Sequence, residues 1–249
     1  VRVNGRVEDK PGTMVPVDCD MEVRPTSGRY VSRGGLKLEG ALRDLDIDVN
    51  GKIAIDVGAS TGGFTDCLLK HGARKVYAVD VGRGQLEWGL RKDPRVVVIE
   101  GVNIRLATPE LFEEKADIIT VDVSFISVTK FLGLLATLIH PGGEILLLVK
   151  PQFEAGRERV GKHGVVRDPA VHEQVIKEVI MAARDAGLTV RGLTFSPIKG
   201  PMGNIEFFLL LGPQGGQPVF RGQGELSTDA VDDAIRHVVE AAHRELSEK

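Results

Sequence analysis

Four charged residues stand at positions whose neighbours in the sequence are apolar. Asp122 and Lys150 each end an apolar run, and Lys37 and Glu206 are lone charges within short apolar stretches. A charged side chain in such a setting needs a partner. An amine held by carboxylates can orient an alcohol or remove its proton. Each residue alone is better explained by a structural ion pair, but the four together favour a catalytic site.

A glycine-rich segment supplies a second candidate site. Residues 56–64, Asp-Val-Gly-Ala-Ser-Thr-Gly-Gly-Phe, leave a predicted strand and open a predicted helix, which is where doubly wound folds bind nucleotides. Asp80 ends the next strand and can accept hydrogen bonds from both hydroxyls of a ribose. Asp56 and Asp80 together suit a cofactor that has an amino-acid end, a nucleoside end and no phosphate. S-adenosylmethionine is such a cofactor.

Two alternatives remain open for this segment. The glycines could serve only the packing of a strand against a helix. The pattern G-x-S-x-G around Ser60 also matches the nucleophile elbow of α/β hydrolases, with downstream histidines as possible bases: His140, His163 and His172. Position counts against a hydrolase, because the elbow normally follows several strands of the catalytic sheet and Ser60 follows the first predicted strand of its domain.

From residue 52 onward, short β-branched runs alternate with longer segments of helical period. The predicted strands are 53–57, 75–79, 96–100, 118–121, 144–149, 190–196 and 206–211. The predicted helices are 36–45, 63–71, 128–139, 169–186 and a charged amphipathic one within 227–249. This alternation predicts an α/β fold, a mostly parallel sheet with helices on both faces that ends in an antiparallel pair. Because adjacent parallel strands end at one edge, we expect Asp122 and Lys150 to form an ion pair.

The composition predicts a globular chain of 249 residues, of which 42% are hydrophobic. No apolar run approaches the roughly 20 residues that cross a bilayer, so no membrane partner is expected. Cys19 and Cys67 match no metal-ligand spacing, which predicts no metal site, and such a distant pair favours the reducing cytoplasm. The net charge of −3 does not indicate a nucleic-acid binder, although segments 24–37 and 150–167 carry four and five basic residues. These segments could be solvated loops or a binding surface.

The first residues form a separate unit in this interpretation. Residues 1–23 predict a small hairpin that turns at Asn4-Gly5 and has little core of its own. A linker rich in proline, serine, glycine and arginine is placed at 24–31, and the large domain at 32–249. The chain starts at Val1 without a secretory pattern, so we expect a cut or processed boundary there.

Six motifs occur in order along the chain: YVSRGGLKL (30–38), DVGASTGGFTDC (56–67), DVG (80–82), DVSFIS (122–127), KPQFE (150–154) and GPMGNIE (200–206). With them, the chain from Val1 to about Gly212 resembles the TlyA, or hemolysin A, group of FtsJ-like ribose 2'-O-methyltransferases. A single motif of this length is weak evidence for a family, but several motifs in the right order are specific evidence.

The resemblance implies a Rossmann-like S-adenosylmethionine methyltransferase that modifies cytidine riboses of small- and large-subunit ribosomal RNA. It implies a catalytic set of Lys37, Asp122, Lys150 and Glu206, in which Lys150 activates or orients the hydroxyl. The implied cofactor contacts are Asp56, Gly58, Ser60, Gly62, Gly63, Phe64, Asp80, Val81, Asn103 and Asp122. Residues 1–23 resemble the second half of an S-four-type RNA-binding domain, whose RNA-contacting helices would precede this chain.

The leading hypothesis is therefore a cytoplasmic methyltransferase whose partners are ribosomal RNA or ribosomal subunits. A noncatalytic RNA-binding scaffold is an alternative from another class, but a scaffold has no need for the acidic and glycine positions of the cofactor segment. A small-molecule methyltransferase is a third, and it leaves the basic segments and the N-terminal unit unexplained. The sequence does not predict the oligomeric state.

Overall fold

A computed structural model describes residues 2–8, 13–22, 28–214, 219–220, 224–225 and 228–247. Its first part is a small antiparallel sheet in the order β2-β1-β3, made of β1 (Arg2–Val3), β2 (Arg6–Val7) and β3 (Met21–Glu22). Asn4 and Gly5 join β1 to β2 with φ angles of 49° and 78°, which suit a two-residue hairpin turn. The predicted hairpin is confirmed, and β3 adds a strand that the sequence pattern did not indicate.

The end of the expected linker packs on the large domain. Tyr30 is buried, and the Val31 backbone N–H donates to Asp66 Oδ2 at 2.9 Å. Lys70 Nζ donates to the Arg29 carbonyl at 2.6 Å. Residues 24–27 of the expected linker lie outside the described residues.

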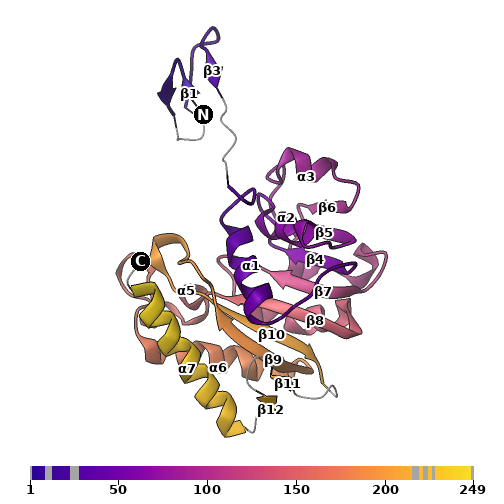
Figure 1. Ribbon diagram of the computed structural model, residues 1–249, viewed down its shortest axis with the longest axis vertical. Helices are drawn as coiled ribbons and strands as arrows, with labels where there is room; N and C mark the ends of the chain where they lie inside the picture. Colours follow the sequence, from indigo (N-terminus) through magenta and orange to yellow (C-terminus); the bar gives the residue numbers. More distant parts are fainter. Residues whose placement is uncertain are drawn as a thin grey trace.

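Within the described ranges, the main sheet has seven strands in the order β6-β5-β4-β7-β8-β10-β9 (Figure 1). They are β4 (Ile53–Val57), β5 (Lys75–Asp80), β6 (Val96–Glu100), β7 (Ala116–Val121), β8 (Ile139–Val149), β9 (Leu188–Phe195) and β10 (Phe207–Pro213). The strands from β6 to β8 pair in parallel, and β10 is antiparallel to both β8 and β9. The predicted Rossmann-like sheet with its antiparallel pair is confirmed. A short pair, β11 (Val219–Phe220) and β12 (Gly224–Glu225), follows.

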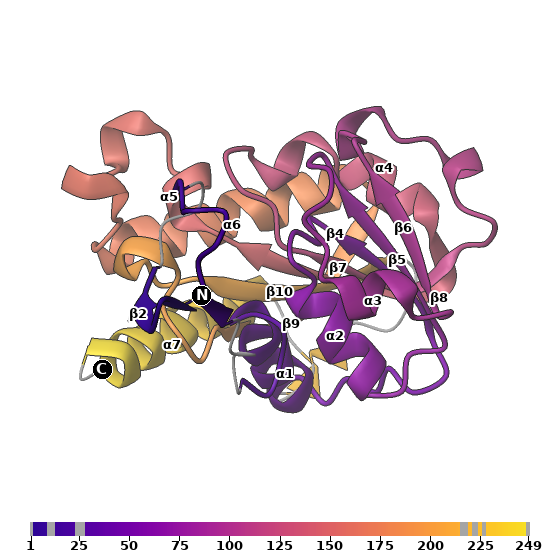
Figure 2. The same ribbon diagram turned by 90° about the horizontal axis from the view of Figure 1, so that it is seen from above.

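Helices cover both faces of this sheet, with α1 and α2 on one side and α4 and α6 on the other (Figure 2). The α-helices are α1 (Gly34–Asp44), α2 (Gly63–Lys70), α3 (Trp88–Lys92), α4 (Leu132–Leu138), α5 (Pro151–Glu154), α6 (Pro169–Asp185) and α7 (Thr228–Ser247). The 3₁₀ helices are η1 (Ile104–Leu106), η2 (Pro109–Leu111), η3 (Val128–Lys130), η4 (Arg157–Arg159), η5 (Lys162–Gly164) and η6 (Pro201–Gly203). None of the helices in the described part of the chain is long and apolar enough to cross a membrane.

One predicted helix was wrong in its extent. The segment 128–139 is divided into η3 and α4, and β8 begins at Ile139, ahead of the predicted start at residue 144. The Pro-Gly-Gly sequence at 141–143 is typical of a turn. The strand nevertheless continues through it, with a shift in its register against β7.

The core lies in two layers, one on each face of the sheet. Along β8, Ile145, Leu147 and Val149 face the layer of α4, α6 and α7, whereas Leu146 and Leu148 face the layer of α1 and α2. Successive side chains of a strand point to opposite faces. Because both faces are covered, β8 is apolar at every one of these positions, as is typical of a central strand.

The parallel strands place their carboxyl ends at one edge of the sheet. β7 and β8 are adjacent, and the residues that follow them are Asp122 and Lys150. β10 runs the other way and pairs Phe207 with Val149. Glu206, which precedes Phe207, therefore lies at the same edge as Lys150. Because β10 is antiparallel to β8, the residue before its first position lies at the carboxyl edge of the parallel strands. In a parallel strand, Glu206 would lie at the opposite edge.

Candidate active site

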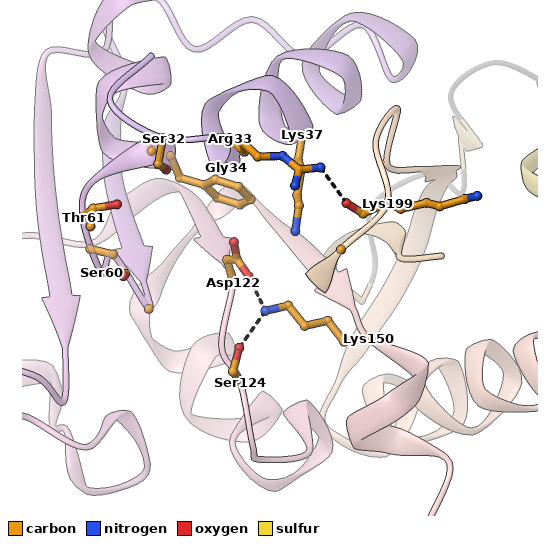
Figure 3. Close-up of a pocket in the computed structure, with 15 residues that line it drawn as sticks. Ser32, Arg33, Gly34, Lys37, Ser60, Thr61, Asp122, Ser124, Lys150 and Lys199 are labelled. Atoms are coloured by element: carbon orange, nitrogen blue, oxygen red, sulfur yellow. Dashed lines mark hydrogen bonds and ion pairs between the residues drawn. The ribbon is translucent and has the colours of Figure 1, made fainter. Parts of the chain in front are cut away.

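Lys150 has two side-chain partners at the carboxyl edge of the sheet. Its Nζ lies 2.6 Å from Asp122 Oδ1 and donates to Ser124 Oγ at 2.9 Å (Figure 3). The side chains of Lys150 and Asp122 are 8% and 20% exposed, so solvent ions screen this pair less than a surface pair. The ion pair that was predicted from the strand ends is confirmed.

Lys37 and Glu206 form a second ion pair. Lys37 Nζ lies 2.6 Å from Glu206 Oε2, and the two side chains are 9% and 0% exposed. Glu206 Oε1 accepts a hydrogen bond from Gln152 Nε2 at 3.5 Å. A Cβ atom at Gly200 would lie 2.2 Å from Glu206 Oε1, so a larger residue could not approach the carboxylate as closely. The enclosed carboxylate is compensated by Lys37, as a buried charge requires.

The two pairs meet at a cavity of about 440 Å³. Lys37, Asp122 and Lys150 line it, whereas Glu206 reaches it through its contact with Lys37. The other lining residues come from the start of α1, the glycine-rich loop, the loop after β7 and the loop before β10: Ser32, Arg33, Gly34, Gly58, Ala59, Ser60, Thr61, Gly63, Phe64, Ser124, Lys199 and Gly200. Four basic side chains and one acidic side chain line this first cavity, which favours an anionic ligand such as a nucleic-acid backbone.

A second cavity, of about 460 Å³, adjoins the first. The two share four lining residues: Gly58, Ser60, Asp122 and Ser124. Asp80 and Asn103 line the second cavity together with Gln85 and an apolar wall: Val57, Val79, Val81, Val102, Ile104, Val123, Phe125 and Ile126. Its volume is within the usual range of small-molecule sites. A carboxylate beside an apolar wall suits a nucleoside, because the ribose needs acceptors and the base needs an apolar surface.

Asp80 also holds the glycine-rich loop in place. Its Oδ2 accepts from the Ser60 backbone N–H at 2.8 Å, and its Oδ1 accepts from that of Gly82 at 2.7 Å. Ser60 has a φ of 48°, a left-handed conformation that is uncommon for a residue with a side chain. Each carboxylate oxygen can accept more than one hydrogen bond, so Asp80 can hold the loop and still bind a ribose.

Two glycines are required where this loop approaches other backbone segments. Gly58 has a φ of 85°, and a Cβ there would lie 2.5 Å from the Asp122 carbonyl oxygen. A Cβ at Gly63 would lie 3.0 Å from the Gly35 backbone nitrogen and 3.2 Å from the Gly34 Cα, as well as 2.2 Å from Ser32 Oγ. The loop therefore packs directly on the segment that carries Asp122 and on the residues before α1.

Two predicted cofactor contacts lie outside the walls of both cavities. Asp56 is fully buried and accepts from Thr65 Oγ1 at 2.7 Å and from Thr120 Oγ1 at 3.0 Å. Burial raises the pKa of its carboxyl group to about 7. Gly62 packs on Leu86 and Leu90, which are buried. Asp56 and Gly62 support the loop from within the protein. The other predicted contacts line the cavities: Gly58, Ser60, Gly63, Phe64, Asp80, Val81, Asn103 and Asp122.

The sequence interpretation did not single out three polar residues of the first cavity. Ser124, two residues beyond Asp122 on the same loop, contacts Lys150, and Arg33 donates to the Lys199 carbonyl at 3.1 Å. Ser124 and Arg33 stand inside quoted motifs, so their motifs were the available signal. Lys199 is in a loop whose course depends on how β9 and β10 pack.

The hydrolase alternative is not supported by this geometry. Ser60 Oγ lies 3.5 Å from Gln85 Oε1. In the part of the chain that the structure describes, no hydrogen bond joins Ser60 to a histidine. His172 instead contacts the Val166 carbonyl and His243, at 3.2 Å and 2.9 Å.

Comparison with known families distinguishes the remaining hypotheses. The sequence profile of the FtsJ-like methyltransferases matches residues 30–213. This chain belongs to the FtsJ-like methyltransferase family. The predicted family is thereby confirmed, and the match covers the glycine-rich loop and all four charged residues of the two ion pairs.

Proteins similar to this FtsJ-like methyltransferase are named either as rRNA methyltransferases or as hemolysins. It is 42% identical to the 16S/23S rRNA (cytidine-2'-O)-methyltransferase TlyA of Mycobacterium tuberculosis, over 96% of this chain and 87% of that protein. It is 50% identical to YqxC of Bacillus subtilis, provisionally named an rRNA methyltransferase, over 97% of this chain and 84% of that protein. A solved structure from Streptococcus thermophilus, provisionally named a hemolysin, is 45% identical and has a TM-score of 0.82, with 98% of this chain and 86% of that chain covered.

More distant solved structures support the fold alone. Two S-adenosylmethionine-dependent methyltransferase structures, from Listeria monocytogenes and Corynebacterium glutamicum, are 16% and 14% identical to this chain and have TM-scores of 0.51 and 0.50. The cofactor of an FtsJ-like methyltransferase is S-adenosylmethionine. In the second cavity, the carboxylate of Asp80 fits the ribose of this cofactor, and the apolar wall fits its base.

Proposed function

We propose that this chain methylates the ribose 2'-hydroxyl of cytidines in ribosomal RNA, with S-adenosylmethionine as methyl donor, in the cytoplasm. The observation that carries this proposal is the position of Lys150. Its amine contacts Asp122 and Ser124, which both line the first and the second cavity. A base or orienting group is needed where the acceptor hydroxyl meets the methyl group, and the shared boundary of two cavities is suited to that meeting.

We assign the second cavity to the nucleoside of the cofactor. Asp80 would accept from the ribose hydroxyls, and Val81 and the Asn103 region would contact the base. The rest of the cofactor would contact Gly58, Ser60, Gly63, Phe64 and Asp122. Asp56 and Gly62 would act indirectly, by supporting the glycine-rich loop. When bound, S-adenosylmethionine supplies an activated methyl group on a sulfonium.

We assign the first cavity to the target nucleotide. Lys150 would contact the 2'-hydroxyl and would either orient it as an ammonium or, as a neutral amine, take up its proton and become the ammonium. Asp122 would keep the nitrogen in position and compensate the ammonium charge. Lys37, held by Glu206, would offer its amine as a second hydrogen-bond donor to the same cavity. Arg33 and Lys199 would interact with phosphates, which position a nucleic acid without reading its sequence.

The N-terminal unit supports an RNA substrate. Its β1–β2 hairpin agrees with the resemblance of residues 1–23 to part of an S-four-type RNA-binding domain. The names of the relatives favour cytidine in ribosomal RNA, either free or within ribosomal subunits. We propose the boundaries 1–23, 24–31 and 32–249 for the RNA-binding unit, the linker and the methyltransferase domain.

The test is to incubate the protein with methyl-labelled S-adenosylmethionine and purified ribosomal subunits or ribosomal RNA. Alkaline hydrolysis then separates ribose from base methylation, because a 2'-O-methyl group blocks cleavage of the adjacent phosphodiester. We expect the label in alkali-resistant dinucleotides. Label in mononucleotides would indicate base methylation, and absence of label together with measured cofactor binding would favour the noncatalytic scaffold.

A further inference from the structure

We propose that Ser124 is a positioning residue for methyl transfer: it fixes the direction in which the amine of Lys150 points. This inference rests on the proposed function and adds to it a residue that the four charged positions do not include. Ser124 is neutral, and it is the one side chain besides Asp122 to which Lys150 is hydrogen-bonded or ion-paired among the described residues.

A second contact is needed because of the nature of the lysine side chain. Lysine carries a compact charge on a flexible four-carbon stem, so one ion pair restrains the position of Nζ but leaves its rotation free. Asp122 Oδ1 at 2.6 Å and Ser124 Oγ at 2.9 Å occupy two directions around Nζ. In an ammonium group, one of three N–H directions is then left for the substrate.

The place of Ser124 agrees with this role. It lines both cavities, as do Gly58, Ser60 and Asp122. Of these four residues, Asp122 and Ser124 contact Lys150, and Figure 3 shows both contacts converging on its Nζ. A methyl group that passes from one cavity to the other crosses the boundary that these two residues form.

The loop that carries Ser124 is fastened at its far end. Glu154 accepts from Ser127 Oγ at 2.6 Å and from the Val128 backbone N–H at 3.0 Å. Glu154 ends α5, which begins directly after Lys150. The segments 122–128 and 150–154 are therefore joined at both ends, so Ser124 remains opposite Lys150 without help from a ligand.

These contacts predict a selective effect of removing the hydroxyl. Ser124→Ala leaves the Asp122–Lys150 ion pair in place, so folding and cofactor binding should persist. The loss of a hydrogen bond to a charged group should lower kcat by about 10- to 100-fold. Ser124→Thr keeps a hydroxyl and should restore most of the rate, whereas Ser124→Cys, with its weaker acceptor, should fall between threonine and alanine.

The experiment measures kcat and KM for ribosomal subunits, and calorimetric Kd for S-adenosylmethionine, in the full chain and these three variants. Thr137→Ala is the matched control, because Thr137 is exposed on α4 and its hydroxyl donates locally to the Leu134 carbonyl. We expect kcat to fall in the order Ser, Thr, Cys, Ala at position 124, while KM and Kd stay within about twofold of the wild-type values. The Thr137→Ala control should leave all three constants unchanged.

An unchanged kcat in Ser124→Ala, or a parallel loss of kcat, cofactor affinity and thermal stability in all three variants, would overturn the role of Ser124. In either case the wild type would still label ribose, so the proposed function would stand. A wild type that binds S-adenosylmethionine but labels no RNA ribose would overturn the proposed function and this inference with it.

Discussion

The amine of Lys37 lies 2.6 Å from the carboxylate of Glu206, although the two residues are 169 positions apart in the chain. Replacing Glu206 with leucine leaves a largely buried ammonium without its counter-charge, which should lower the free energy of unfolding by about 3–5 kcal/mol. The double variant Lys37→Met with Glu206→Leu removes both charges and should be more stable than the single variant. Urea unfolding measures both values.

The control for this comparison is the exposed Arg236–Asp233 pair on α7, whose side chains are 58% and 73% exposed. Asp233→Asn should cost less than about 1 kcal/mol, because water already solvates both charges. Equal costs for Glu206→Leu and Asp233→Asn would contradict the importance of burial.

Lys150→Ala should abolish methyl transfer while cofactor affinity stays nearly unchanged. The amine is assigned to the acceptor hydroxyl, and removal of a general acid–base or orienting group typically lowers the rate by about 10²- to 10⁴-fold. Lys130→Ala, which removes an exposed lysine of η3, is the control. A labelling rate of Lys150→Ala within about tenfold of the wild-type rate would refute the assignment.

Asp80→Asn should weaken S-adenosylmethionine binding by about 10- to 100-fold, because it removes a charged acceptor from the second cavity. The change also loosens the loop, since Asp80 accepts from the backbones of Ser60 and Gly82. Calorimetry measures the affinity. Asp48→Asn, at an exposed turn where Asp48 accepts from the Asn50 backbone, should bind as the wild type does, and an equal loss in both variants would argue against a specific contact.

Asp56 should make folding stability depend on pH. Burial raises the pKa of its carboxyl group from 3.8 to about 7, so the folded protein holds a proton that the unfolded chain releases between these values. The contribution of Asp56 to the free energy of unfolding therefore falls as pH rises from about 4 to about 7 and is level above that range. Asp56→Asn lacks this dependence.

The measurement for Asp56 is urea unfolding of wild type and Asp56→Asn at pH 5, 6, 7 and 8. The stability of the variant relative to the wild type should increase up to about pH 7. Subtracting the free energy of unfolding of the wild type from that of the variant at each pH removes the contributions of the other titrating groups, because both proteins contain them. A difference that does not vary with pH would contradict the raised pKa.

The sequence by itself determined the seven strands of the main sheet and the edge of that sheet at which the charged residues lie. The predicted strands 53–57 and 96–100 agree with β4 and β6 residue for residue. The ion pair of Asp122 and Lys150 was predictable because both residues follow adjacent parallel strands. These features depend on local periodicity and on a general rule of parallel sheets.

Tertiary structure decided what each side chain meets. Asp56 accepts from Thr65 on α2 and so lies outside the cavities, because α2 packs on the face of β4 to which Asp56 points. Lys37 meets Glu206 because α1 packs on one face and β10 enters the sheet antiparallel between β8 and β9. Local patterns carry no information on such contacts, since the distance between two segments far apart in the chain is fixed by how whole elements pack.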